Sequence, residues 1–157
     1  MRKIQNPYTK TGNEAYQCFA CSPNNEIGLH LEFWEVGEEV ISKWMPRASL
    51  QGFMNVLHGG IQATLLDEIA SWIVQTRCKT VGVTASMEVF YRRPVLISAG
   101  EITLRARVKE VGSRIAVIET ELFGNDGKLC ASAVVKYFLF SAEKAKEEYF
   151  YPGADAF

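Results

Sequence analysis

The chain has 157 residues, of which 48% are hydrophobic, and its formal net charge is -1. This length favours a single domain with a core of ordinary size, and the balanced charge argues against a protein that binds nucleic acid through bulk basicity. No apolar run approaches the roughly eighteen residues of a membrane-spanning helix, and no apolar segment follows the basic N-terminus. We therefore expect a cytoplasmic protein with no nucleic-acid partner and no membrane partner.

Residues 1–26 are polar and rich in turn signals, which predicts an N-terminal arm. The arm contains a C-x-x-C pair, Cys18 and Cys21, while the other two cysteines are isolated in the sequence. A tetrahedral zinc site usually needs a second pair, although His30 could contribute a ligand, and a redox C-x-x-C normally follows a strand in a βαβ unit. We expect reduced structural thiols and no metal.

The hydrophobic period changes to two after the arm. Within residues 28–36, Leu29, Leu31 and Phe33 alternate with His30, Glu32 and Trp34, which predicts a strand. Residues 39–46 predict a second strand, which ends at Pro46.

The stretch NVLHGGIQATLLDEIASWIVQ, residues 55–75, has the pattern of a long buried helix. Its apolar residues from Ile61 onward cover well over half of the helix circumference, whereas a surface helix has a narrower apolar stripe. The polar arc carries two adjacent carboxylates. Asp67 lies where this arc meets the core, and Glu68 lies deeper in the arc and is expected to be solvated.

Four strands are expected after the helix, at residues 81–94, 100–112, 114–124 and 128–140. The GNDG sequence at residues 124–127 is a strong hairpin signal. The order β-β-α-β-β-β-β with hairpin links predicts an α+β fold, in which a mostly antiparallel sheet wraps one long helix. We place this domain at residues 27–141 and a C-terminal tail at residues 142–157.

The predicted helix begins at Leu57-His58-Gly59-Gly60, without a Ser, Thr, Asp or Asn cap. Free N–H groups at the positive end of a helix suit an anion or a developing oxyanion, and glycine lets a ligand approach the backbone. The alternative is that both glycines merely allow close packing of helix and sheet. At a rise of ~1.5 Å per residue, Asp67 lies ~12 Å along the helix axis from Gly59. One substrate could therefore contact a Gly59 N–H and an Asp67 carboxylate together only if they come from two antiparallel helices of a dimer.

HGGIQATLLDE at residues 58–68, followed by GVTASMEVFYRRPV at residues 82–95, resembles the hotdog-fold acyl-CoA thioesterases of the PaaI-like group. CFACSPNNEIGLHLEF in the arm is similar to the first segment of some members, and the resemblance extends from Cys18 to Phe140. It implies a curved sheet around a central helix. It also implies hydrolysis of a fatty-acyl or aryl-acyl thioester of coenzyme A, with coenzyme A as part of the substrate and no other cofactor.

The resemblance also implies roles for single residues. Asp67 would act as general base or nucleophile, and Gly59 would give its N–H to the thioester carbonyl. Thr84 would help to hold the water, unless it is an ordinary strand threonine. His58 belongs to the candidate site but is more often a structural hydrogen-bonding residue than an acid or base. The acid would come from the partner subunit of a homodimer or homotetramer.

Many relatives carry an Asn that completes the oxyanion hole at the position of Gly52. Gln51, Asn55 or a water could supply that amide in this chain.

Basic residues are expected near the phosphates of coenzyme A. Arg93 and Arg114 lie at strand ends and are the candidates, together with Gly60 at the helix start. Arg105 and Arg107 alternate along a strand and are expected to face water.

Two other functions remain open. A hotdog dehydratase or hydratase would pair a catalytic His with an acid, but its His is not followed by Gly-Gly. A non-catalytic hotdog module would bind acyl-CoA as a sensor or carrier, and the retained Asp67 argues against it.

Overall fold

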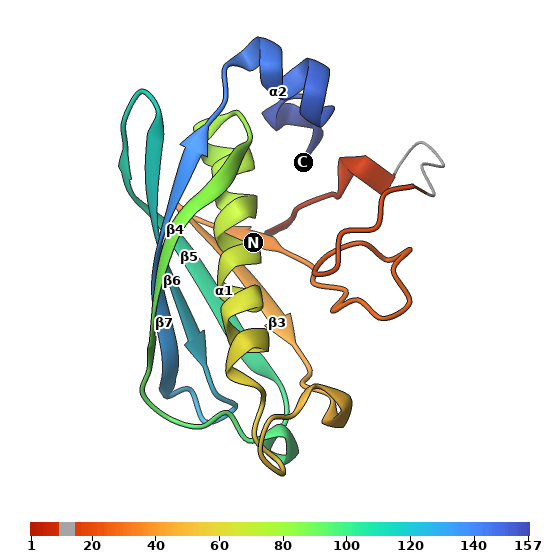
Figure 1. The fold of residues 1–157 in the computed structure, drawn as a ribbon, viewed down its shortest axis with the longest axis vertical. Helices are drawn as coiled ribbons and strands as arrows, with labels where there is room; N and C mark the ends of the chain where they lie inside the picture. The colour runs from red at the N-terminus through yellow and green to blue at the C-terminus, as the bar shows by residue number, and fades with distance from the viewer. Residues whose placement is uncertain (10–14) are drawn as a thin grey trace.

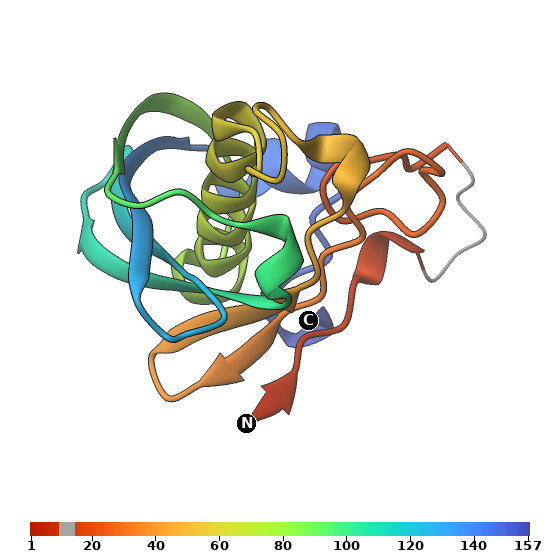
Figure 2. The same ribbon diagram turned by 90° about the horizontal axis from the view of Figure 1, so that it is seen from below.

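The computed structural model describes residues 1–9 and 15–157, so residues 10–14 of the predicted arm lie outside the described part. One long helix, α1 (Gly59–Ile73), lies against a seven-stranded antiparallel sheet (Figure 1). Seen from below, the sheet curves around this helix (Figure 2). The predicted α+β architecture is confirmed. Within the described residues, no helix has the length and apolar character needed to cross a membrane.

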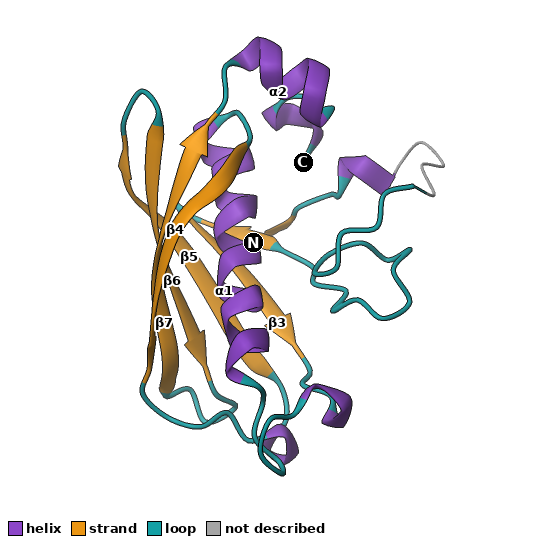
Figure 3. Ribbon diagram, in the orientation of Figure 1, coloured by secondary structure: helices purple, strands orange, loops and turns teal. Residues whose placement is uncertain are grey.

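The sheet has the order β1-β2-β3-β5-β6-β7-β4, and every neighbouring pair is antiparallel (Figure 3). Strand β4 follows α1 in the chain but pairs with the last strand, β7, which leaves β4 at one edge of the sheet. The strands are β1 (Arg2–Lys3), β2 (Trp34–Val36), β3 (Glu39–Trp44), β4 (Gly82–Tyr91), β5 (Ile102–Val111), β6 (Ile115–Phe123) and β7 (Leu129–Leu139).

Short helical segments connect these elements. The last turn of α1 continues as a π-helical segment, and the tail contains α2, which Ser141 caps by accepting a hydrogen bond from the N–H of Lys144. The segments are η1 (Pro7–Thr9), η2 (Ala48–Leu50), η3 (Val74–Cys78), η4 (Ile97–Ala99), α2 (Ala142–Tyr149) and η5 (Ala154–Ala156).

The core lies between α1 and the concave face of the sheet. Leu65, Leu66 and Ile69 of α1 are completely buried, as are Leu104 and Ile118 of the facing strands. Burial of such side chains contributes roughly 1.5–3 kcal/mol each relative to exposure. The broad apolar arc predicted for this helix is therefore explained by the sheet that wraps it.

The first predicted strand, residues 28–36, is only partly a sheet strand. Leu29 and Leu31 are buried in the predicted alternation, but their N–H groups donate to the carbonyls of Phe19 (2.8 Å) and Ala20 (2.9 Å) in the arm. The ladder with β3 begins only at Trp34. The alternation was correct, and the hydrogen-bonding partner of its first half is the arm.

The arm and the tail pack together over the side of α1 that faces away from the sheet (Figure 1). The ring of Phe157 meets Trp72 of α1 edge-on, with centroids 5.7 Å apart, and Tyr8 at 6.1 Å. Arg2 donates from Nη1 to the carbonyl of Phe157 at 2.6 Å. Both ends of the chain therefore contribute to the core around α1.

Candidate active site

Asp67 lies on α1 where the helix meets β4 and β7. Its Oδ1 atom accepts hydrogen bonds from Thr84 Oγ1 at 3.0 Å and from the hydroxyl of Tyr137 at 2.7 Å. No donor among residues 1–9 and 15–157 contacts Oδ2. Two side chains on one oxygen fix the carboxylate, and the second oxygen is left for a water or a substrate. Thr84, which the resemblance implied would help to hold the water, contacts the Asp67 carboxylate directly.

Tyr137 was missed by the sequence analysis. It comes from β7, opposite Thr84 in the β4–β7 ladder, and only 1% of its surface is exposed. Burial, followed by the charge of Asp67, raises the pKa of Tyr137 well above its usual range. The hydroxyl therefore keeps its proton and stays a donor to the carboxylate.

The start of α1 corrects one prediction, because the helix does have a capping side chain. His58 accepts a hydrogen bond at Nδ1 from the N–H of Gly60, at 2.9 Å. An imidazole that accepts at Nδ1 carries its ring proton at Nε2. His58 thus serves as a structural hydrogen-bonding residue, and the N–H of Gly60 is already occupied.

Gly59 differs from Gly60 in both its backbone N–H and its surroundings. Its N–H has no acceptor among the described residues. A Cβ at Gly59 would meet the ring of Tyr91 at 3.5 Å, an ordinary contact, whereas a Cβ at Gly60 would lie 3.0 Å from His58 Nδ1. Close packing therefore does not require glycine at position 59. The free N–H and the open approach favour Gly59 as the oxyanion donor.

The two side chains that could replace the oxyanion-hole amide missing at Gly52 differ in the hydrogen bonds they already form. Asn55 is tied to η4 at both ends, since its Nδ2 donates to Ser98 Oγ at 2.8 Å and its Oδ1 accepts from Ser98 N at 2.9 Å. Gln51 uses only its Oε1, which accepts from Asn55 N at 3.0 Å. The Nε2 of Gln51 is the amide donor that remains.

Glu68 was expected to be solvated, and this prediction is wrong. Its Oε1 accepts from Trp72 Nε1 at 2.9 Å and faces the sulfur of Cys18 at 3.6 Å. Burial, followed by the charge of Cys18, raises the pKa of Glu68 to about 7. The helical pattern could not reveal this environment, because the arm that covers Glu68 lies fifty residues away in the chain.

Arg93 and Arg114 lie at opposite ends of β7. The N–H of Arg93 donates to the carbonyl of Cys130 at 3.1 Å, and the carbonyl of Arg114 accepts from Leu139 at 2.7 Å. Nine strand residues at ~3.3 Å each separate these contacts by ~30 Å. Each lines a separate cavity, of ≈ 350 Å³ for Arg93 and ≈ 520 Å³ for Arg114. One chain therefore does not bring the two arginines to one pocket.

The two strand-face arginines lie in solvent, as expected. Arg107 is exposed and forms an ion pair with Glu119 at 2.8 Å, and Arg105 lies over the ring of Phe123 at 5.4 Å. Both side chains therefore contact neighbouring residues on the outer face of β5.

Strand β4 has an unpaired edge within the described residues. It is ten residues long, and most of its side chains are exposed, including Val83, Phe90 and Tyr91. A long apolar edge strand is a template for pairing with another chain. Thr84, which touches Asp67, and Tyr91, whose hydroxyl donates to the carbonyl of Gly59 at 2.7 Å, both lie on it.

A family model described as the thioesterase superfamily matches residues 54–131. The match includes α1, with Gly59 and Asp67, and all of β4, with Thr84, and it ends before Tyr137. A curated protein of Saccharolobus solfataricus, provisionally named an esterase, is 28% identical over 117 residues, which cover 74% of this chain and 76% of the relative. A second, from Haemophilus influenzae and also provisionally named an esterase, is 30% identical over 115 residues, which cover 70% and 80% of the two chains.

Among solved structures, a hypothetical thioesterase protein from Streptococcus pneumoniae, crystallised with coenzyme A, superimposes with a TM-score of 0.65 at 18% identity. The superposition covers 71% of this chain and 89% of that one, and shows the same helix-in-sheet fold. Three findings agree with the resemblance that was based on the H-G-G sequence and Asp67. They are the family match, the relative at 30% identity over most of both chains, and the shared hotdog fold. The chain belongs to the thioesterase superfamily.

Proposed function

We propose that the protein hydrolyses an acyl thioester of coenzyme A, with a fatty-acyl or aryl-acyl group as in the PaaI-like enzymes. The observation that carries this proposal is the Asp67 carboxylate, which is fixed by Thr84 and Tyr137 through one oxygen and free at the other. Thioester hydrolysis needs a positioned base and a free N–H to stabilise the oxyanion. Asp67 supplies the base, and Gly59 of the same helix supplies the N–H. The coenzyme A crystallised with the Streptococcus pneumoniae protein supports the substrate class.

In the proposed reaction, a water attacks the thioester carbonyl while Oδ2 of Asp67 takes its proton. The carbonyl oxygen becomes an oxyanion, which the N–H of Gly59 stabilises by roughly 3 kcal/mol. The C–S bond then breaks, and the proton passes from Asp67 to the departing thiolate of coenzyme A. The products are the free acid and coenzyme A, and the carboxylate returns to its ionised form.

We further propose that the site is shared between two chains of a homodimer, which could pair again into a homotetramer. Gly59 and Asp67 are ~12 Å apart along one helix, too far to act on one carbonyl. Antiparallel pairing of the exposed β4 edges would bring the Thr84 end of one strand beside the Tyr91 end of the other. It would also bring Arg93 of one copy and Arg114 of a second copy toward the same end of the paired strands.

The dimer can be tested by mixing two inactive variants. Asp67→Asn and Gly59→Val chains, refolded or co-expressed together, should form heterodimers in which one of the two sites is intact. A random mixture should then recover about a quarter of the wild-type activity per chain. If the mixture is as inactive as its components, both residues of each site belong to one chain. An active particle of 17.6 kDa in light scattering would lead to the same conclusion.

The activity is tested by incubating a panel of aliphatic and aromatic acyl-CoAs with the protein and a thiol reagent. Asp67→Asn should lower kcat on the order of a hundredfold or more, the scale of a missing general base. Asp155→Asn, an exposed carboxylate in the tail, is the matched control and should leave kcat unchanged. Binding of acyl-CoA without release of thiol would support a carrier or sensor, and hydration of an enoyl-CoA without thiol release would support a hydratase.

A further inference from the structure

The C-x-x-C pair of the arm meets a carboxylate of α1 in the folded protein. Cys18 Sγ lies 3.2 Å from Cys21 Sγ and 3.6 Å from Glu68 Oε1. One ligand atom from each of the three residues lies within 4.8 Å of the others. Sequence spacing suggested Cys18 and Cys21 with His30 as a further possible donor. It did not point to Glu68, which comes from a helix fifty residues further along the chain.

This cluster concentrates acidic groups without a basic partner. Glu68 accepts from Trp72 Nε1, and it forms no ion pair with any Lys, Arg or His of the described residues. Tyr16, whose hydroxyl lies 3.0 Å from Cys21 Sγ, is a further acid. Buried acidic groups are costly unless they are paired with a cation or coordinate a metal. A bound cation would supply the positive charge that the surrounding side chains lack.

Metal binding displaces the protons of thiol ligands. An ion held by this cluster would therefore take both cysteines as thiolates, and the 3.2 Å contact between the two sulfurs already brings them to one side of the site.

We propose that Cys18, Cys21 and Glu68 form a binding site for Zn²⁺, with water as the fourth ligand. Two thiolates and one carboxylate are donors that select zinc over magnesium or calcium. A tetrahedral ion with Zn–S of ~2.3 Å and Zn–O of ~2.0 Å sets an S···S separation of ~3.8 Å and an S···O separation of ~3.5 Å. The contact of 3.6 Å between Cys18 and Glu68 matches this geometry, and the two sulfurs must separate by about 0.6 Å.

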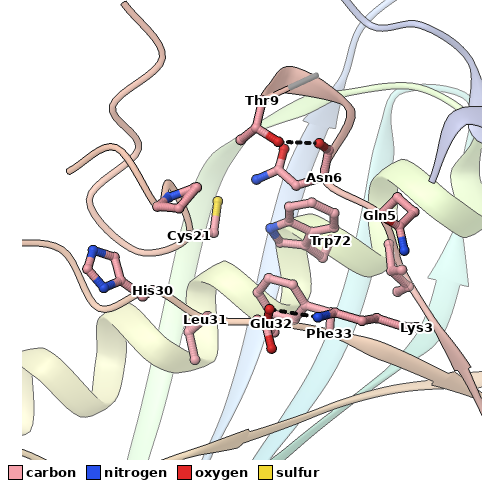
Figure 4. Close-up of a pocket in the computed structure, with 12 residues that line it drawn as sticks. Lys3, Gln5, Asn6, Thr9, Cys21, His30, Leu31, Glu32, Phe33 and Trp72 are labelled. Atoms are coloured by element: carbon pink, nitrogen blue, oxygen red, sulfur yellow. Dashed lines mark hydrogen bonds and ion pairs between the residues drawn. The ribbon is translucent and has the colours of Figure 1, made fainter. Parts of the chain in front are cut away.

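A cavity gives the ion access to this cluster. It has a volume of ≈ 450 Å³ and lies between the arm and α1, with Cys21, His30 and Trp72 among its lining residues. Figure 4 shows the sulfur of Cys21 on the cavity wall, between His30 and Trp72. The hydrogen bond from Trp72 to Glu68 orients the carboxylate, which is the role of an outer-shell partner in metal sites. A bound ion would fasten the arm to α1 beside Asp67.

The test measures metal binding and does not depend on the proposed hydrolysis. The full-length protein is reduced, stripped with a chelator, and titrated with Zn²⁺ against a chromophoric competitor, with Co²⁺ as the spectroscopic probe. We expect one ion per chain, a near-ultraviolet thiolate-to-cobalt charge-transfer band, and a higher Tm with Zn²⁺ than without it. Cys18→Ser, Cys21→Ser and Glu68→Gln should each weaken Zn²⁺ binding at least tenfold.

Cys78→Ser and Cys130→Ser are the matched controls, because both thiols are free and lie outside the cluster. They should bind Zn²⁺ like the wild type. Absence of stoichiometric binding by the reduced wild type, or of the charge-transfer band with Co²⁺, would overturn the proposal without reference to any variant. So would undiminished binding by Glu68→Gln. A reduced protein that ignores zinc but forms a Cys18–Cys21 disulfide under mild oxidation would identify a redox pair instead.

Discussion

Replacing Tyr137 by Phe should separate the orientation of the Asp67 carboxylate from the stability of the fold. Tyr137→Phe keeps the buried ring but removes the hydroxyl, which lies 2.7 Å from Asp67 Oδ1 and 2.7 Å from the backbone carbonyl oxygen of Asp67. A hydrogen bond to a charged group contributes ~1.5–3 kcal/mol, and ~1.4 kcal/mol corresponds to tenfold in rate. Because Thr84 still holds the same oxygen, we expect kcat to fall by about tenfold to a hundredfold with little change in KM.

Tyr151→Phe is the matched control for this variant. Its hydroxyl is also buried and donates to a backbone carbonyl, that of Gln75, at 2.7 Å, but it contacts no carboxylate. Both variants should lower Tm by similar amounts, and only Tyr137→Phe should lower thiol release from acyl-CoA. A double-mutant cycle with Thr84→Val should show coupling, since both side chains hold one oxygen. Equal loss of kcat in the two tyrosine variants would refute the proposed role of Tyr137.

Two further predictions concern α1. Gly59→Ala adds a methyl group in ordinary contact with Tyr91, so Tm should be retained. The methyl group lies beside the N–H and should crowd the thioester oxygen, so kcat should fall more than KM rises, because an oxyanion donor acts mainly in the transition state. Normal turnover would show that the proposed reaction does not require a glycine at this position. Leu66→Ala leaves a cavity at a fully buried position. Urea unfolding should therefore show that the free energy of unfolding falls by ~2–5 kcal/mol. A fall below about 1 kcal/mol would mean that the sheet does not enclose the helix as described.

The fold was largely predictable because its signals are local. The apolar arc of residues 61–74 and the alternation along β5, β6 and β7 can be recognised in the sequence without knowing which elements pack against them. In contrast, the partners that modify a side chain are set by the folded chain. Glu68 lies in the polar arc of the helix, and only the folded structure shows that the arm covers it. The sequence pattern indicates only that Tyr137 is a core residue of a strand, because its contact with Asp67 depends on how α1 packs on the sheet.

The candidate site could be predicted only as far as its residues share one motif. Asp67, Gly59 and Thr84 were proposed from the resemblance to hotdog thioesterases, which rests on two adjacent segments of the sequence. The capping role of His58 was missed because the usual cap rules favour short side chains such as Ser and Asp. The ~30 Å between Arg93 and Arg114 could not be known before β7 was placed between them.

The pairing of β4 with β7 also sets when the site can form during synthesis. Asp67 and its donor Tyr137 are separated by 70 residues, so at roughly 5–20 residues per second a ribosome needs several seconds to make the second after the first. Until then α1 and the edge strand have no β7 to pack against, and contacts between distant segments are slow to form. The Asp67 carboxylate should therefore acquire its fixed orientation among the last events of folding, after β5 and β6 have enclosed the helix.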